Sequence, residues 1–136
     1  TVISRIANAI AEFEPVIMLA DASEHAAASK ILSGNVELWD IPTDDLWCRD
    51  SGPLFVVNDA GERAVSHIAF NGWGRYRLPS DEQISARVAE YMGVPLYESG
   101  LVGEPGGAEA DGRGLVMAHE SSWINGNRKP GRPKLR

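Results

Sequence analysis

The stretch from Thr43 to Pro53 concentrates the side chains that could do chemistry. Its eleven residues, Thr-Asp-Asp-Leu-Trp-Cys-Arg-Asp-Ser-Gly-Pro, include three carboxylates, an arginine, an indole and a thiol. A thiol is a candidate nucleophile, and grouped carboxylates suit a cationic ligand. The apolar segment Leu54–Val57 follows and predicts a strand, which Pro53 can begin but could not interrupt. We therefore expect the polar group on a loop that enters a strand, a common place for binding and catalytic residues.

Two further polar stretches follow this one. The first is Phe70–Gly74, Phe-Asn-Gly-Trp-Gly; the second is Glu104–Gly114, followed by Glu120–Arg128, Glu-Ser-Ser-Trp-Ile-Asn-Gly-Asn-Arg. In order and spacing, the three stretches resemble the agmatine deiminase and bacterial-type peptidylarginine deiminase family, whose signature Trp-x-Arg-Asp-x-Gly-Pro the first stretch matches. The resemblance covers nearly the whole chain, from the first predicted helix to Pro130.

The resemblance implies a hydrolase of the guanidine-modifying superfamily that needs no metal and no organic cofactor. The full enzyme would convert agmatine and water to N-carbamoylputrescine and ammonia, a step towards putrescine. Carboxylates bind the planar guanidinium, a cysteine thiolate attacks its central carbon, and a histidine moves protons. Deimination of peptidyl or free arginine is the alternative within the family. A non-catalytic ligand-binding relative is the alternative from a different class.

Two side chains of the first stretch are candidates for substrate contact. In the resemblance, Asp50 matches the aspartate that grips the guanidinium, and Trp47 matches an aromatic beside the aliphatic part of the substrate. Taken without the resemblance, an Asp before a strand is commonly a turn former and a Trp commonly belongs to the core. Arg49 is expected to pair with Asp44 or Asp45 and so to hold the loop.

Glu104 is the second candidate catalytic carboxylate. The family has Glu-Gly-Gly at the substrate pocket, whereas this chain has Glu-Pro-Gly-Gly, and Pro105 fixes one backbone dihedral angle of that loop. Trp73 is expected to line the substrate pocket or to pack its own loop. The adjacent Gly72 and Gly74 indicate unusual backbone angles there.

Cys48 is not expected to be the nucleophile. In a strand-like segment its side chain would face away from the neighbouring Trp and Arg. The resemblance implies a nucleophilic cysteine near the C-terminus of family members, after a His-x-Asp segment, and both would lie beyond this chain. His25, His67 and His119 lack the spacing of metal ligands, so we expect structural or surface roles and no metal site.

Composition excludes several function classes. A formal net charge of −6 argues against general affinity for nucleic acid or acidic membranes and favours cationic small molecules. No apolar run approaches the length of a membrane span. A single cysteine rules out an internal disulfide framework and fits a reducing, cytoplasmic compartment. The run from Arg128 to Arg136 is basic. We expect it to belong to a truncated chain that lacks its packing partners, and a basic tail that binds a polyanion is the alternative.

Hydrophobic spacing predicts the elements that position these residues. Three helices are predicted, at residues 1–14, from Asp21 or Ser23 to about Leu32, and at residues 80–92. A capping box of Ser80 and Gln83 would begin the third helix, and Gly93 would end it. Strands are predicted at 16–20, 35–39, 54–58, 64–70, 94–97 and 115–118. Residues 100–107 are predicted to form a glycine-rich loop, and Asp111-Gly112 a hairpin turn.

The order helix, strand, loop and hairpin occurs twice, at about 23–70 and 81–119. One such unit cannot bury both faces of its small sheet, whereas several stacked around an axis could. The resemblance implies an α/β fold of this kind, a five-bladed α/β-propeller of pseudo-fivefold ββαβ units, of which this chain would form roughly two blades. We expect residues 1–136 to be one partial domain, truncated at both ends, of a protein that could be a homo-oligomer. The alternative is a free-standing two-layer α+β domain.

Overall fold

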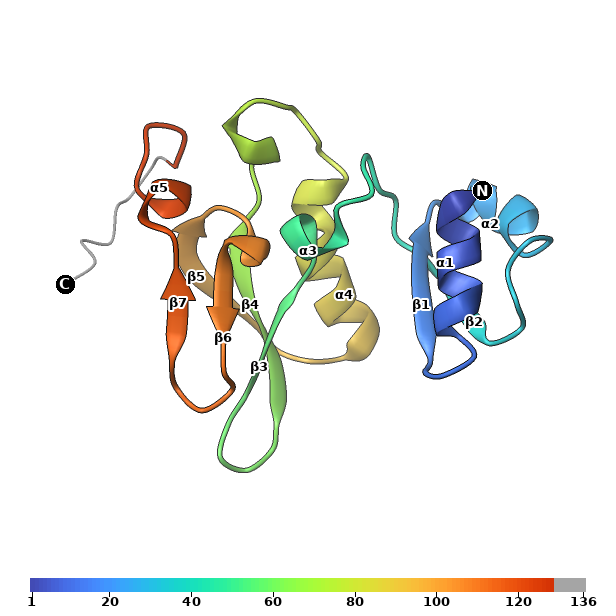
Figure 1. Cartoon of the computed structure of the whole chain (residues 1–136), viewed down its shortest axis with the longest axis horizontal. Helices are drawn as coiled ribbons and strands as arrows, with labels where there is room; N and C mark the ends of the chain where they lie inside the picture. Colours follow the sequence, from blue (N-terminus) through green and yellow to red (C-terminus); the bar gives the residue numbers. More distant parts are fainter. Residues whose placement is uncertain (129–136) are drawn as a thin grey trace. The chain divides into compact units, whose positions relative to one another are not determined.

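The computed structural model describes residues 1–128, and its contacts divide the chain into two compact units. The first unit comprises residues 1–43 and the second begins at Asp44 (Figure 1). Within residues 1–128, no helix is both long enough and apolar enough to cross a membrane. The predicted basic tail lies outside the described residues, except for Arg128.

The first unit pairs two strands in parallel. Its elements are α1 Val2–Ile10, β1 Val16–Ala20, α2 Ala22–Ala28 and β2 Val36–Asp40. Parallel strands require a crossover connection, which α2 provides between β1 and β2. Both strands and both helices were predicted from the sequence, and the described structure confirms them.

Both helices of the first unit are shorter than predicted. The first ends at Ile10 instead of residue 14, and residues 11–13 form a turn before Pro15. The second ends at Ala28 instead of Leu32. Its start is as expected, since the carboxylate of Asp21 accepts a hydrogen bond from the backbone N–H of Ser23.

The second unit is built on a three-stranded sheet in the order β3-β4-β5. Its elements are α3 Cys48–Ser51, β3 Leu54–Val57, β4 Arg63–Ala69, the 3-10 turns η1 Gly72–Gly74 and η2 Asp81–Gln83, α4 Ile84–Met92, β5 Leu96–Val102, the 3-10 turn η3 Pro105–Gly107, β6 Ala108–Ala110, β7 Val116–Ala118 and α5 Glu120–Trp123. The strands β3 and β4 form the predicted antiparallel hairpin, and β5 adds to β4 in parallel through the crossover helix α4. Figure 1 shows α4 beside this sheet, with the β6–β7 hairpin nearer the C-terminus.

The core of the second unit lies between α4 and β4. Ile84 and Val88 of α4 and Val65 and Ile68 of β4 are all less than one-tenth exposed. Gly93 ends α4 in the left-handed conformation, with φ of 62°, as predicted. The strand predicted at 94–97 begins at Leu96 and continues to Val102, so part of the predicted glycine-rich loop is strand.

Two local predictions in the second unit are wrong. The residues before β3 form the one-turn helix α3 instead of a strand-like loop, so the strand-based argument about the direction of Cys48 does not hold. The predicted capping box of Ser80 and Gln83 is absent, because the Ser80 side chain makes no capping hydrogen bond. Instead the carboxylate of Asp44, 36 residues earlier in the chain, accepts a hydrogen bond of 2.7 Å from the backbone N–H of Ser80.

Candidate active site

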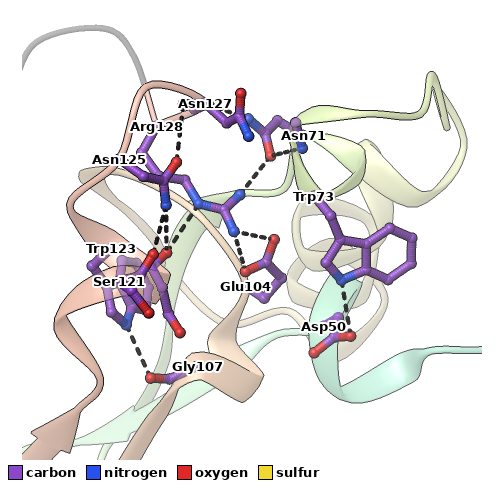
Figure 2. Close-up of polar contacts among 12 residues, drawn as sticks. Asp50, Asn71, Trp73, Glu104, Gly107, Ser121, Trp123, Asn125, Asn127 and Arg128 are labelled. Atoms are coloured by element: carbon purple, nitrogen blue, oxygen red, sulfur yellow. Dashed lines mark hydrogen bonds and ion pairs between the residues drawn. The ribbon is translucent and has the colours of Figure 1, made fainter.

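Asp50 lies on α3 and is half-buried. Its Oδ2 accepts a hydrogen bond of 3.2 Å from the indole N–H of Trp73, as Figure 2 shows. On the other side, Gly106 of η3 approaches so closely that a Cβ there would lie 2.4 Å from Asp50 Oδ1. The aspartate is therefore placed by an indole from one loop and by the backbone of another.

Trp73 is in a strained loop conformation. Its φ of 58° is the only positive value among the non-glycine residues that the structure describes. The indole packs edge-on against Phe70 and Tyr76, with ring centroids 5.1 and 6.1 Å away. A left-handed aromatic residue is unfavourable unless its surroundings hold it, and such strain is frequent at binding sites. Of the two predicted roles, packing of the loop is present, together with a hydrogen bond to Asp50.

Glu104 is buried, with 7% of its surface exposed, and precedes the turn η3. Pro105 occupies the first position of η3, where a missing N–H costs nothing, and the backbone N–H of Gly107 closes the turn on the Glu104 carbonyl oxygen at 2.9 Å. The proline that departs from the family's Glu-Gly-Gly pattern is therefore accommodated by the local backbone. Trp123 fixes the far end of the turn by donating its indole N–H to the Gly107 carbonyl oxygen at 2.9 Å.

The guanidinium of Arg128 is the partner of Glu104. Its Nη2 donates to both carboxylate oxygens, at 2.6 and 2.5 Å, and both side chains are 9% exposed. In Figure 2 this guanidinium lies between Glu104 and Asn71, to which Nη1 donates at 2.8 Å. Sequence reasoning did not assign Arg128 a site role. The available signal was its position at the end of the polar stretch Glu120–Arg128. We instead interpreted this arginine as the first residue of the basic run that follows.

The structure places Trp47 at the start of α3. The residue is 55% exposed, so it is not part of the core among the described residues. Its carbonyl oxygen accepts the backbone N–H of Asp50 at 2.9 Å, which closes the single turn of α3. Trp47 thus precedes Asp50 by one helical turn, and its side chain is on an exposed part of the second unit.

Arg49 does not form the predicted pair with Asp44 or Asp45. Its Nη2 pairs instead with Glu109 of β6 at 2.7 Å, on the surface, because α3 directs this side chain towards the β6–β7 hairpin. The Arg49–Glu109 pair is about two-thirds exposed and contributes little to stability.

Asp44 and Asp81 cap each other's segments. Asp44 accepts the backbone N–H of Ser80 at 2.7 Å, and Asp81 accepts the backbone N–H of Asp44 at 2.7 Å and that of Asp45 at 3.4 Å. Burial raises the pKa of Asp81 above its ordinary value, against the hydrogen bonds from Asp44 and Asp45, which lower it. This reciprocal cap fixes the chain just before α3 and just before α4.

Cys48 is exposed at the start of α3. The histidines lie outside the Asp50 and Glu104 loops: His25 Nε2 contacts the Ala20 carbonyl oxygen at 3.1 Å, and His67 Nδ1 contacts the Glu98 carboxylate at 3.0 Å. His119 Nδ1 contacts the Ser121 hydroxyl at 2.9 Å. Within residues 1–128, no group of three or more His, Cys, Asp or Glu side chains could hold a metal ion.

Comparison with known proteins places these loops in context. The sequence profile of the family described as Porphyromonas-type peptidyl-arginine deiminase matches residues 1–135. The agmatine deiminase of Pseudomonas putida is 37% identical over 133 residues, and that of Ectopseudomonas mendocina is 35% identical over 133 residues. Each alignment covers 92% of this chain and 36% of the relative.

A solved structure is also similar to this chain. The agmatine deiminase of Enterococcus faecalis matches with a TM-score of 0.84 and 26% identity, over 93% of this chain and 36% of that chain. The predicted α/β class is confirmed by this similarity and by the elements described above. The chain spans just over a third of the length of the relatives that it matches.

Proposed function

Because the chain belongs to the Porphyromonas-type peptidyl-arginine deiminase family, we propose that it is part of a hydrolase that deiminates a guanidinium compound. Agmatine is the proposed substrate, since the relatives described above are agmatine deiminases. The reaction would take agmatine and water to N-carbamoylputrescine and ammonia. The protein that contains this chain together with the remaining segments of its relatives is called the full-length enzyme below.

The observation that carries this proposal is the approach of η3 to Asp50. Since a Cβ on Gly106 would lie 2.4 Å from Asp50 Oδ1, the turn that begins after Glu104 passes directly against the Asp50 carboxylate. Two carboxylates on adjoining loops can accept paired, charge-assisted hydrogen bonds from one planar cation. Their separate supports, Trp73 for Asp50 and Arg128 for Glu104, hold them before any ligand arrives.

The proposed roles follow from these positions. Asp50 accepts hydrogen bonds from the guanidinium nitrogens, Glu104 supplies the second carboxylate, and Trp47 and Trp73 flank the aliphatic chain of the substrate. A cysteine thiolate outside this chain attacks the guanidinium carbon, and ammonia leaves with a proton from a histidine that is also outside it. Water then hydrolyses the amidino-thioether to release N-carbamoylputrescine and the thiol.

The wider architecture is part of the same proposal. We place residues 1–136 in one partial domain that forms roughly two blades of a five-bladed α/β-propeller. The remaining blades would cover apolar side chains that are exposed here, such as Ile3 and Ile6 of α1. The full-length enzyme would use no metal or organic cofactor, would work in the cytoplasm and could be a homo-oligomer.

Replacing Asp50 by Asn in the full-length enzyme tests the carboxylate clamp. The amide keeps the size of the side chain but presents an NH2 group to a ligand that only donates. Loss of a charge-assisted pair in a desolvated site costs about 2–5 kcal/mol, or roughly 30- to several-thousand-fold in kcat/KM. Asp59→Asn, in the exposed β3–β4 turn, is the matched control and should keep normal kinetics. Normal kcat/KM in folded Asp50→Asn would contradict the clamp.

The substrate itself is tested by assaying ammonia and the ureido product with agmatine, free arginine and an arginine peptide. We expect agmatine to give the highest kcat/KM. Preference for either arginine substrate would favour the alternative activity within the family. Binding of agmatine without turnover, in an enzyme with an intact fold, would favour a ligand-binding relative.

A further inference from the structure

Arg128 is a buried cation to which the proposed reaction assigns no task. All three of its guanidinium nitrogens donate hydrogen bonds: Nη2 to Glu104, Nη1 to Asn71 and Nε to the Ser122 carbonyl oxygen at 3.1 Å. The pair with Glu104 is 9% exposed on both sides, so this guanidinium does not face solvent as part of a basic tail for a polyanion. Burial of a charge at this level requires close partners, which the three contacts provide.

The contact with Asn71 extends the influence of Arg128 to the Trp73 loop. Asn71 Oδ1 accepts from Arg128 and also from the backbone N–H of Gly74 at 3.0 Å, which closes the loop around Trp73. Asn71 Nδ2 donates to the Asn127 carbonyl oxygen at 2.8 Å. The two segments are in direct contact as well, because a Cβ on Gly74 would lie 2.3 Å from the Cβ of Asn127.

The loop around Trp73 in turn supports Asp50. Trp73 holds an unfavourable left-handed conformation, and its indole N–H donates to Asp50 Oδ2 at 3.2 Å. Figure 2 shows the whole sequence of contacts, from Glu104 through Arg128 and Asn71 to the loop that carries Trp73 and then Asp50. One guanidinium therefore supports one carboxylate directly and the other through a loop.

We propose that Arg128 is a positioning residue that sets the relative placement of the Asp50 and Glu104 carboxylates. This inference rests on the proposed function, because the two carboxylates matter together only if they bind one guanidinium. The planar fork of arginine serves Glu104, Asn71 and Ser122 in three directions at once. A lysine has one ammonium group at the end of a flexible stem and cannot reproduce this geometry.

Arg128→Lys in the full-length enzyme tests the inference, with Arg113→Lys as the matched control on the exposed β6–β7 turn. A displacement of about 1 Å in a positioned group lowers the rate about 10²-fold, so kcat/KM for agmatine should fall by that order in Arg128→Lys. Arg113→Lys should stay within about twofold of the unmodified enzyme, as is usual for surface changes. The KM for agmatine should also rise, because the carboxylates that grip the cation are displaced.

A purely structural role would give a different pattern. An enzyme that is only less stable loses active molecules, so its apparent kcat falls while its KM is unchanged and cooling restores the rate. That pattern, or a kcat/KM for Arg128→Lys within about twofold of the unmodified value, would overturn the proposal.

The indole N–H resonance of Trp73, assigned with Trp73→Phe, is a readout that does not require catalysis. We expect it to shift in Arg128→Lys, since the loop that aims it at Asp50 is released, while the Trp39 resonance of the first unit stays in place. An unshifted Trp73 resonance would overturn the link to Asp50. If the unmodified full-length enzyme does not deiminate agmatine, the proposed function fails, and the Trp73 resonance still decides whether Arg128 positions the loop.

Discussion

Gly106→Ala should misplace Asp50 without changing any group that takes part in the proposed reaction. No positive φ requires glycine at this position, so the backbone itself accepts alanine. The new methyl group, however, would lie 2.4 Å from Asp50 Oδ1. Ordinary contact begins at 3.4 Å, so Asp50 or the turn η3 has to move by about 1 Å. Either movement changes the distance between Asp50 and the loop of Glu104.

The size of the effect follows from this displacement. A misplacement of about 1 Å in a catalytic arrangement costs about 10²-fold in rate, which corresponds to roughly 2.7 kcal/mol of transition-state stabilisation. If Asp50 moves, its hydrogen bond with Trp73 is weakened, which lowers the free energy of unfolding by about 1 kcal/mol. Activity should therefore decrease much more than stability.

The assay is steady-state release of ammonia from agmatine by the full-length enzyme, with a thermal melt of each variant. Gly34→Ala is the control, since a Cβ there meets nothing within 4 Å and the residue has no positive φ. It should leave kcat/KM unchanged and stabilise the fold slightly, by about 0.4–1 kcal/mol, through lower entropy of the unfolded chain. A folded Gly106→Ala enzyme with kcat/KM within about twofold of normal would refute the argument that this contact sets the site.

Three further expectations concern other parts of the chain. The chain of residues 1–136 alone should release no ammonia from agmatine and should aggregate, because apolar side chains such as Phe13, 87% exposed, lack partners; turnover, or a sharp melt of a monomer, would contradict this. Cys48→Ser should keep most of the activity of the full-length enzyme, and a folded but inactive variant would contradict the placement of the nucleophile outside this chain. The pKa of Asp81 is raised by burial, so the folded state holds this proton more tightly and Asp81 lowers stability as pH rises through its folded pKa. The melting temperature of Asp81→Asn relative to that of the unmodified enzyme should hence increase as pH rises above about 4, the ordinary range of an aspartate; a constant difference would exclude this source of pH dependence.

Elements with strong local signals were predictable from the sequence. Gly93 ends α4 and Asp111-Gly112 turns the β6–β7 hairpin because each position has its own backbone requirement, which the residue type reveals. The hairpin of β3 and β4 follows in the same way from two apolar runs around a turn. These features depend on residues within a few positions of one another.

Features that depend on distant residues were missed. The segment that leads into α4 looked like a local capping box at Ser80, yet the Ser80 backbone N–H at the start of η2 is capped by the carboxylate of Asp44, which only the folded chain brings near. Arg49 was matched to nearby aspartates but pairs with Glu109, 60 residues away. Arg128 is the same case, since its partner Glu104 is 24 residues distant and the sequence does not show that the two side chains meet.

For the candidate site, the sequence indicated which residues carry the polar chemistry but not how they are held. Asp50, Trp73 and Glu104 were named from their stretches, and the structure brings the loops of all three together. The indole bond to Asp50 could not be foreseen, because it joins residues 23 positions apart that only the folded chain brings together. The roles of these residues in catalysis stay predictions until the variants above are measured.

The distance along the chain between Glu104 and Arg128 also affects the order of events during synthesis. A ribosome adds roughly 5–20 residues per second, so the 24 residues between them take about 1–5 s to appear. For that time Glu104 has no guanidinium partner, and Asn71, which closes the Trp73 loop through Gly74, lacks its bond to Arg128. The strands β3 and β4 are synthesised before either residue, so their hairpin can form before Arg128 is available to position Glu104.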